Sequence, residues 1–184
     1  PGLVNAYVPI LRDMNRDKAT RDAVLALVDE YRIGHGPGST GADGLPCKPY
    51  FGRAARVMVV VDAPNGEDEG AGIMGLSRSY DCVREAMDQA GLSITDVYWT
   101  ALIKRPKSGR QVNAEEVMLY RPYFEKELEI LKPTVLVMLG SQAVRAMLPT
   151  FKGKASDAAG EVIYFKDRDM NAVIGFSPGE IYHA

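Results

Sequence analysis

Short runs of apolar, mostly β-branched residues recur from position 57 onward and alternate with segments of helical spacing. The runs predict strands at Val57–Val61, Val97–Ile103, Thr134–Leu139, Val162–Phe165 and Ala172–Phe176. The segments between them predict helices over Tyr80–Ala90, Ala114–Leu131 and Ser141–Leu148. Continuous apolar strands separated by helices are typical of a parallel sheet with both faces covered. The pattern therefore predicts an α/β fold, a three-layer α/β/α sandwich around a central four-stranded, mainly parallel sheet.

The first quarter of the chain has a different pattern. Asp17–Tyr31 places apolar residues at helical spacing and predicts an amphipathic helix, whereas Gly34–Pro46 is rich in Gly and Pro and predicts a loop. We therefore expect residues 1–46 to pack, as a helix and a loop, on an α/β domain formed by residues 47–184. Because the chain begins at a proline without methionine, we also expect it to be a piece of a longer protein.

Composition narrows the classes of function. The chain has 184 residues, of which 46% are hydrophobic and 25% charged, as in an ordinary globular domain. The net charge of -2 gives no global basic field, so a nucleic-acid partner would need a local patch. No apolar window is long enough to span a membrane. Neither GxxxxGK[ST] nor GxGxxG occurs, so ATP and NAD have no motif support.

Cysteine usage indicates the redox environment. Cys47 and Cys82 lie far apart and form neither a disulfide framework nor a zinc motif. This usage is typical of a reducing cytoplasm.

Ligands of parallel α/β sheets bind beyond the carboxyl ends of the strands. Four loops are expected there: APNGEDEG at Ala63–Gly70, Thr100–Arg110, GSQ at Gly140–Gln142, and FSPGE at Phe176–Glu180. We refer to this edge as the rim, and the candidate chemistry lies on it.

The first rim loop begins with an acid. Asp62 directly follows a strand that Pro64 cannot continue, because proline has no N–H to donate. A carboxylate there could orient a water or balance a developing cation. The alternative is an Asp that caps its own turn. The consecutive acids Glu67–Glu69 diverge in direction, which favours a solvated surface turn over a metal site.

The other rim loops offer groups for phosphate. The second loop carries four cations around a proline and a glycine: Lys104, Arg105, Lys107 and Arg110. Lysine and arginine are common in exposed loops, but the position of these four at the rim favours contact with a phosphodiester backbone. Ser141 is placed to be the N-cap of its helix, whose first turn could also hold a phosphate. Pro178 and Gly179 follow Ser177 in a tight turn, where backbone amides could approach a ligand.

Four stretches together resemble the uracil-DNA glycosylase superfamily, in particular its iron–sulphur bacterial and archaeal branch. The resemblance covers roughly Ala55–Tyr182, most of the chain, and is carried by these stretches: VDAPNGEDEG at Val61–Gly70, TALIKRPKSGRQVNAEE at Thr100–Glu116, RPYFEKELEILKPTVLVMLGSQAVRAML at Arg121–Leu148, and SPG at Ser177–Gly179. The resemblance implies a uracil-DNA glycosylase-like fold. It also implies DNA, single- or double-stranded, as the partner.

The resemblance assigns roles position by position. Asp62 falls where the family places the group that handles the attacking water, and Ala63 and Pro64 flank it in the base pocket. Ala101 replaces the asparagine that reads uracil, and Ser177 the histidine that steadies charge on the base.

Two further family features are missing from the sequence. Gly75 or Leu76 stands where the family has a stacking ring. The four cluster cysteines are absent, with only Cys47 in the right region, so we expect no iron–sulphur centre and no other cofactor.

These departures lead to three hypotheses. The preferred one is a DNA-binding glycosylase-like module, degenerate for uracil excision, in a replication or repair assembly of a bacterium or phage-infected host. A DNA polymerase or another replication protein would then be its partner, since such domains occur fused to phage-type polymerases. The second is an active glycosylase of altered base specificity that uses Asp62. The third is a protein-interaction domain alone.

Overall fold

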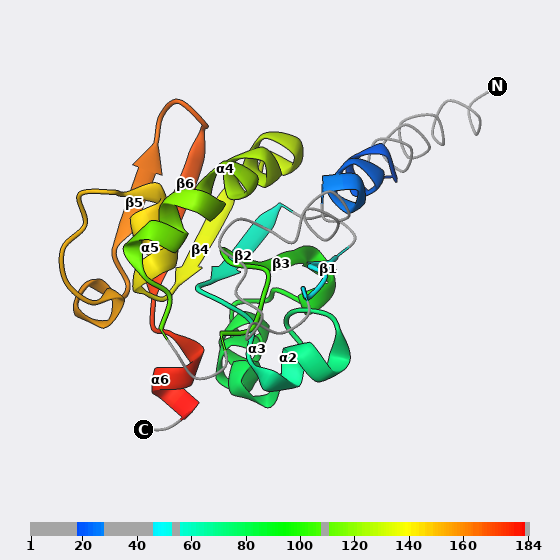
Figure 1. Cartoon of the computed structure of the whole chain (residues 1–184), viewed down its shortest axis with the longest axis horizontal. Coiled ribbons are helices and arrows are strands. Elements are labelled where there is room, and N and C mark those ends of the chain that lie inside the picture. Colours follow the sequence, from blue (N-terminus) through cyan, green and yellow to red (C-terminus); the bar gives the residue numbers. More distant parts are fainter. Residues whose placement is uncertain (1–17, 28–45, 53–55, 108–110, 183–184) are drawn as a thin grey trace.

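The computed structural model describes residues 18–27, 46–52, 56–107 and 111–182. Residues 18–27 are helical, as predicted, and the remainder of the predicted Asp17–Tyr31 helix lies outside the described residues, as does most of the predicted loop. The other elements follow in chain order (Figure 1): β1 (Tyr50–Phe51), β2 (Val57–Val61), α2 (Gly66–Ala71), η1 (Arg78–Tyr80), α3 (Asp81–Gln89), η2 (Ile94–Asp96), β3 (Val97–Ala101), α4 (Ala114–Leu131), β4 (Val135–Leu139), α5 (Ser141–Met147), η3 (Ala155–Ala158), β5 (Val162–Phe165), β6 (Met170–Gly175) and α6 (Pro178–Tyr182).

The strands form one six-stranded sheet in the order β1-β3-β2-β4-β6-β5. The four inner strands β3, β2, β4 and β6 are parallel, as the sequence predicts. The prediction of four strands is nevertheless too low, because β1 and β5 add an antiparallel strand at each edge. Two-residue β1 carries no periodic signal, and β5 reaches the sheet as the first arm of a β5–β6 hairpin rather than by a crossover.

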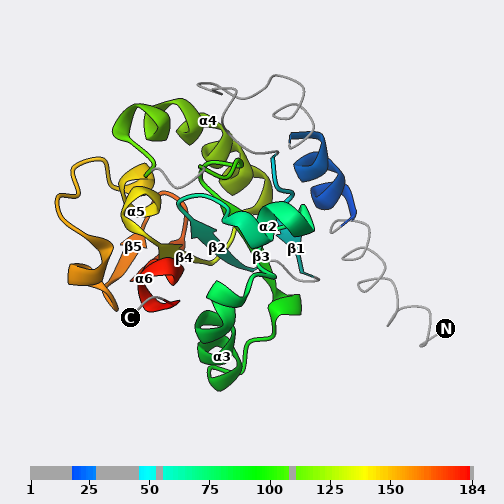
Figure 2. The ribbon, with the colours of Figure 1, turned by 60° about the horizontal axis from the view of Figure 1, so that its bottom comes forward.

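Helices lie on both sides of the sheet, with α4 and α5 on one side and α3 on the other (Figure 2). Alternate residues of β4 illustrate the division. Leu136 and Met138 belong to the core under α4 and α5, and Leu139 belongs to the smaller core under α3. Val24 of the N-terminal helix joins the larger core. The three-layer arrangement is therefore as predicted.

The end of α4 carries a residue in a left-handed conformation. Lys132, the C-cap, has φ 47° and ψ 57°, where an L side chain is disfavoured and glycine is preferred. Its side chain is exposed. A glycine here would relieve the steric conflict of the Cβ atom with the following carbonyl, at some cost in unfolded-state entropy.

We expect Lys132→Gly to raise the free energy of unfolding by about 0.5 to 1 kcal/mol, since relief of the left-handed strain exceeds the entropy cost. Urea unfolding followed by circular dichroism measures it. Lys126→Gly, in the middle of the same helix, is the matched control and should lower the free energy of unfolding by about 1 kcal/mol. Equal effects of the two glycines would contradict the strain assigned to Lys132.

Candidate functional site

A pocket of about 240 Å³ opens beside Asp62, where β2 and β4 end. It brings together five of the residues that the sequence placed at the rim: Asp62, Ala63, Ser177, Pro178 and Gly179. We call it the Asp62 pocket. The wall also contains four polar residues that the sequence does not assign to a site: Asn65, Ser79, Tyr80 and Tyr182.

Asp62 is tied to the start of α5. Its Oδ1 accepts a hydrogen bond of 2.7 Å from the backbone N–H of Ala143, in the first turn of that helix. The N-cap of α5 is Gly140, at φ 120°, and a Cβ there would lie 2.7 Å from the same oxygen. Asp62 thus caps a helix that is distant in sequence rather than its own turn.

Burial sets the charge of this carboxyl group. Loss of hydration raises the pKa of Asp62 to about 6, although the backbone N–H groups of Ala143 and Gln142 oppose the rise. A carboxylate with this pKa is ionised at neutral pH and lies close to the range expected of a general base.

Ser141 is not the N-cap of α5 that the sequence predicts. The N-cap of α5 is Gly140, and Ser141 is the first helical residue. Its Oγ instead accepts a 2.8 Å hydrogen bond from the backbone N–H of Ala155. The carboxylate of Asp62 supplies the capping acceptor from the neighbouring strand, which the local sequence of α5 could not reveal. Ser141 therefore joins the loop after α5 to the rim.

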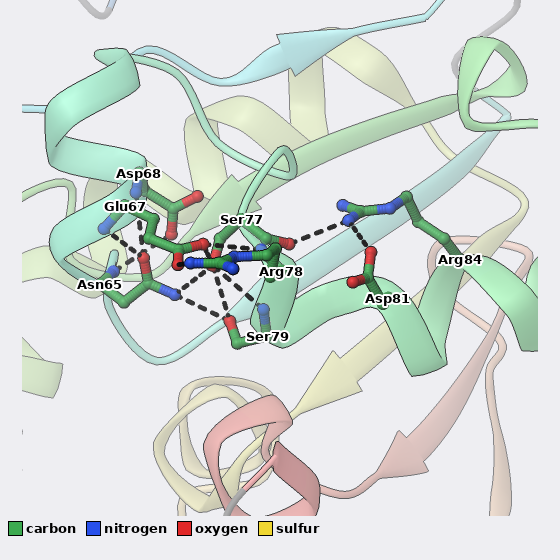
Figure 3. Close-up of polar contacts among 8 residues, drawn as sticks. All are labelled: Asn65, Glu67, Asp68, Ser77, Arg78, Ser79, Asp81 and Arg84. Atoms are coloured by element: carbon green, nitrogen blue, oxygen red, sulfur yellow. Dashed lines mark hydrogen bonds and ion pairs between the residues drawn. The ribbon is translucent and has the colours of Figure 1, made fainter.

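The amide of Asn65 faces the pocket but is fully engaged in the protein (Figure 3). Its Oδ1 accepts from the backbone N–H groups of Glu67 and Asp68, at 2.9 and 3.0 Å. Its Nδ2 donates to Ser77 Oγ and Ser79 Oγ, each at 2.8 Å. Asn65 and Asp68 form the capping box of α2. The Asn-x-x-Asp spacing was a usable signal for a helix where the sequence suggested a turn.

The prediction that the three acids of this segment are solvated is wrong for Asp68. Asp68 is fully buried, and Tyr80 donates its hydroxyl to Asp68 Oδ2 at 2.6 Å. Burial raises the pKa of Asp68, against the lowering effect of that bond. The Tyr80 ring packs on Trp99 with a centroid distance of 4.9 Å. Tyr80 therefore places its ring in the pocket wall, while its hydroxyl is already hydrogen-bonded to Asp68.

Four residues predicted in the base pocket do not line the Asp62 pocket. Pro64 and Ala101 are buried, and Leu76 is exposed. Gly75 packs on the Trp99 ring, where a Cβ would lie 3.1 Å from the indole. A larger side chain at Gly75 would thus collide with the core.

The second rim loop differs most from its prediction. The predicted contact of Lys104, Arg105 and Lys107 with a DNA backbone needs open side chains, but these three side chains are buried, at most 6% exposed. Lys104 Nζ lies 2.7 Å from Glu127 Oε2 and donates to the carbonyl of Ala101, also at 2.7 Å.

The second lysine of this loop is held in the same way. Lys107 Nζ lies 2.6 Å from Glu116 Oε1. Both glutamates belong to α4, and both ion pairs therefore fasten the rim loop to that helix. Arg110 lies outside the described residues.

An iron–sulphur cluster of the kind found in the resembling branch does not fit this chain. The sequence has two cysteines, and a four-thiolate cluster needs four. Cys47 is buried, and burial raises the pKa of its thiol to about 12, which disfavours the thiolate that ligates metal. Across the described residues, no three or more His, Cys, Asp or Glu side chains are grouped to hold a metal ion.

Within the same described residues, no helix has the length and apolar character needed to cross a membrane.

The sheet order, the acid after β2 and the rim pocket define an α/β protein with a polar pocket at the carboxyl edge of a parallel sheet. The chain belongs to the Uracil DNA glycosylase superfamily, which it matches over residues 49–183.

Individual relatives agree with this assignment. The chain is 31% identical over 107 residues to a Type-4 uracil-DNA glycosylase of Pyrobaculum aerophilum, covering 58% of this chain and 54% of that protein. It is 30% identical over 98 residues to a Type-4 uracil-DNA glycosylase of Archaeoglobus fulgidus, covering 53% and 49% respectively. It is also 28% identical over 137 residues to DNA polymerase III subunit alpha of Yersinia pestis, covering 73% of this chain but 11% of that protein. The chain thus spans about half the length of the glycosylases and about a tenth of the polymerase subunit.

Proposed function

We propose that this chain is a DNA-contacting glycosylase-like module, degenerate for uracil excision, in a replication or repair protein of a bacterial or phage-infected cytoplasm. The observation that carries the proposal is the state of the pocket wall. The amide of Asn65 and the hydroxyl of Tyr80 are engaged inside the protein, and Ala101 and Gly75 are buried away from the pocket. A flipped base would find few donors there to grip it.

The magnitudes favour loss of uracil chemistry. Removing one donor aimed at a developing anion typically costs about 3 to 4 kcal/mol of transition-state stabilisation. Ser177 stands where the resemblance places the family's histidine donor, and its backbone N–H is bonded to Glu180 at 3.2 Å. Losing the partner of a buried base removes discrimination of a similar order. The two losses together would reduce uracil excision by several orders of magnitude.

A role in replication is supported by the resemblance to part of a polymerase subunit. That protein is a DNA polymerase III subunit alpha, of which the matching segment is about a tenth. Within such a chain, a degenerate module would contribute contacts to DNA without excising bases. We infer that DNA, and a polymerase chain carrying or contacting this module, are its partners.

The buried rim lysines leave another surface to contact the DNA backbone. Lys152 and Lys154 are exposed in the loop after α5. The bond from Ala155 N–H to Ser141 Oγ holds that loop against the start of α5, the helix that Asp62 caps. Together with Arg110, Pro178 and Gly179, these lysines are our proposed phosphate contacts.

We expect the double variant Lys152→Ala, Lys154→Ala to weaken DNA binding about three- to tenfold in 50 mM salt, and to reduce the salt dependence of log K by about 1 to 2. Fluorescence anisotropy with labelled single- and double-stranded oligonucleotides measures both. The control is Lys126→Ala, Lys166→Ala, which removes equal charge from α4 and from the β5–β6 turn at the opposite end of the sheet. Equal losses in both double variants would contradict this surface, and no DNA binding at low salt would leave a protein-interaction domain.

One observation favours a second candidate, an active glycosylase of altered base specificity. Asp62 lines the pocket, and its pKa of about 6 suits activation of a water molecule. Oligonucleotides carrying uracil, hypoxanthine, xanthine or 5-substituted uracils, read for binding and for alkali-sensitive abasic sites, separate the two. Binding without cleavage supports the first proposal. Cleavage that disappears in Asp62→Asn supports the second and overturns the claim of degeneracy.

A further inference from the structure

The hydrogen bonds behind one wall of the Asp62 pocket run in a fixed direction that begins at Glu67 (Figure 3). Glu67 Oε2 accepts from the backbone N–H of Arg78 at 2.7 Å and from Ser77 Oγ at 3.0 Å. These two bonds lower the pKa of Glu67, so its side chain is an ionised carboxylate at neutral pH and can only accept. The hydroxyl hydrogen of Ser77 therefore points to Glu67.

Ser79, which lines the pocket, takes its orientation from Ser77. Their Oγ atoms are 2.9 Å apart, and because the hydrogen of Ser77 points to Glu67, the hydrogen of this bond comes from Ser79. Ser79 Oγ also accepts from Asn65 Nδ2 at 2.8 Å. Since a hydroxyl has one hydrogen and two lone pairs, Ser79 keeps one lone pair for a ligand and no hydrogen.

The other polar groups of this wall also keep their hydrogens inside the protein. The backbone N–H groups of Glu67 and Asp68 fix the oxygen of the Asn65 amide, so the amide cannot be turned over. Both hydrogens of its Nδ2 are given to Ser77 and Ser79. The hydroxyl of Tyr80 donates to Asp68. Asn65, Ser79 and Tyr80 therefore offer acceptor capacity to the pocket but no donor.

Asp62 adds a second acceptor to the same pocket. Its pKa of about 6 leaves the carboxyl group ionised at neutral pH. An ionised carboxylate has about four lone-pair positions, and the backbone N–H of Ala143 occupies one of them at Oδ1. Ser177 is neutral in this respect, because its hydroxyl can rotate to meet either a donor or an acceptor. The polarity of the pocket is thus set by Asp62 and Ser79, and a matching ligand must donate.

The rest of the lining suits a flat ring. Tyr80 and Tyr182 contribute aromatic rings, and Leu139 and Pro178 contribute apolar surface. Nucleobases stack on aromatic side chains of this kind in single-stranded DNA-binding proteins. The volume of about 240 Å³ is below the roughly 300 to 1,000 Å³ of sites for drug-sized ligands, so the pocket fits one ring system rather than several.

We propose that the Asp62 pocket binds a nucleobase with an exocyclic amino group, cytosine or adenine, on an unpaired DNA strand, and that it disfavours uracil; this inference rests on the proposed DNA-contacting function. The amino group donates to Asp62 and Ser79, in the way that acidic side chains accept from N4 of cytosine. Uracil carries a carbonyl oxygen in place of that amino group. Its oxygen would face acceptor oxygens with no hydrogen between them and would lose its hydrogen bonds to water.

The test uses oligonucleotides of about 11 abasic-analogue residues with one base at the centre, so that a single base can occupy the pocket. We expect cytosine or adenine to lower Kd at least about fivefold relative to the fully abasic strand, and uracil to lower it less than twofold, by fluorescence anisotropy at pH 7.5. Asp62→Asn should remove the gain from the amino bases, because the amide adds a donor and loses the charge. The matched control Asp96→Asn changes an acid in η2, at the amino end of β3, and should keep the gain.

Ser79→Ala is a second test and should reduce the gain from cytosine and adenine about two- to fivefold, with thermal unfolding to verify that each variant is folded. A gain from uracil as large as that from the amino bases, or a gain that survives in Asp62→Asn, would overturn the proposal. The fully abasic strand separates the two levels of inference. If it binds and no base adds affinity, the base preference is wrong and the DNA-contacting function stands, whereas if no strand binds, the proposed function fails as well.

Discussion

Lys104→Met is expected to lower the free energy of unfolding by about 3 to 5 kcal/mol, the largest effect of any single change considered for this chain. The substitution leaves Glu127, which is fully buried, without its cation. Tyr98 and Thr100 still reach Glu127 Oε1, at 2.6 and 3.1 Å, but neither carries a charge. The carboxylate must then be protonated or remain unpaired in the interior, and both cost free energy.

A double-mutant cycle tests this expectation. Glu127→Gln alone leaves the Lys104 ammonium buried, and it should be destabilising to a similar degree. Lys104→Met with Glu127→Gln removes both charges and should recover most of the loss, because the glutamine oxygen still accepts from Tyr98. Urea unfolding of the four proteins gives the coupling free energy, with Lys126→Met as an exposed control near zero. Additive losses in the double variant would show that the pair does not act as a unit.

This ion pair also marks where the sequence was misleading. Position was inferred correctly, since Lys104, Arg105 and Lys107 do follow β3 at the rim. Their exposure is not predictable in this way, because the apolar spacing of α4 does not reveal its buried glutamates. Glu116 and Glu127 are buried residues of that helix and face the loop lysines. Pairing between residues 23 positions apart, as for Lys104 and Glu127, has no local signal.

The regular elements were far more predictable than the site. The strand Val57–Val61 and the helix Ala114–Leu131 have the predicted bounds, because a buried strand and a long helix leave strong periodic patterns. The segment GEDEGA was expected to be a turn and is the helix α2. The cap at Asn65 is a local signal of this helix, whereas the burial of Asp68 against Tyr80 joins residues 12 positions apart and has no local signal.

The location of the candidate site was predictable from the sequence, but the full set of residues that line it was not. The rule that ligands of parallel sheets bind at strand ends brought Asp62 and Ser177 together correctly. The same rule could not say that Tyr80 and Tyr182 would supply the aromatic rings in place of Gly75 and Leu76. Those rings come from η1 and α6, two short elements without a clear periodic pattern.

Asp62→Asn is expected to stabilise the fold at neutral pH, because the native structure disfavours the ionised carboxyl group. The pKa of Asp62 rises from 3.8 to about 6 on folding, which corresponds to at most about 3 kcal/mol. Asp62 is partly open to the pocket, so solvent reduces this to about 1 to 2 kcal/mol. Asparagine keeps an oxygen that accepts from Ala143 N–H and carries no charge.

The pH dependence follows from the direction of the shift. Between about pH 4 and pH 6 the native state binds more protons at Asp62 than the unfolded state, so the wild type loses stability as pH rises through this range. Above pH 6 the penalty is complete, and below pH 4 it is absent. The stability difference between Asp62→Asn and wild type should therefore grow from near zero at pH 4 to its full value at pH 7, as measured by urea unfolding at each pH. A difference that does not vary with pH, or a destabilised variant at pH 7, would mean that the cap on α5 requires the charge. In that case Asp62 would be primarily a structural anion that stabilises the rim, and not a carboxylate whose ionised form is disfavoured by burial beside a pocket.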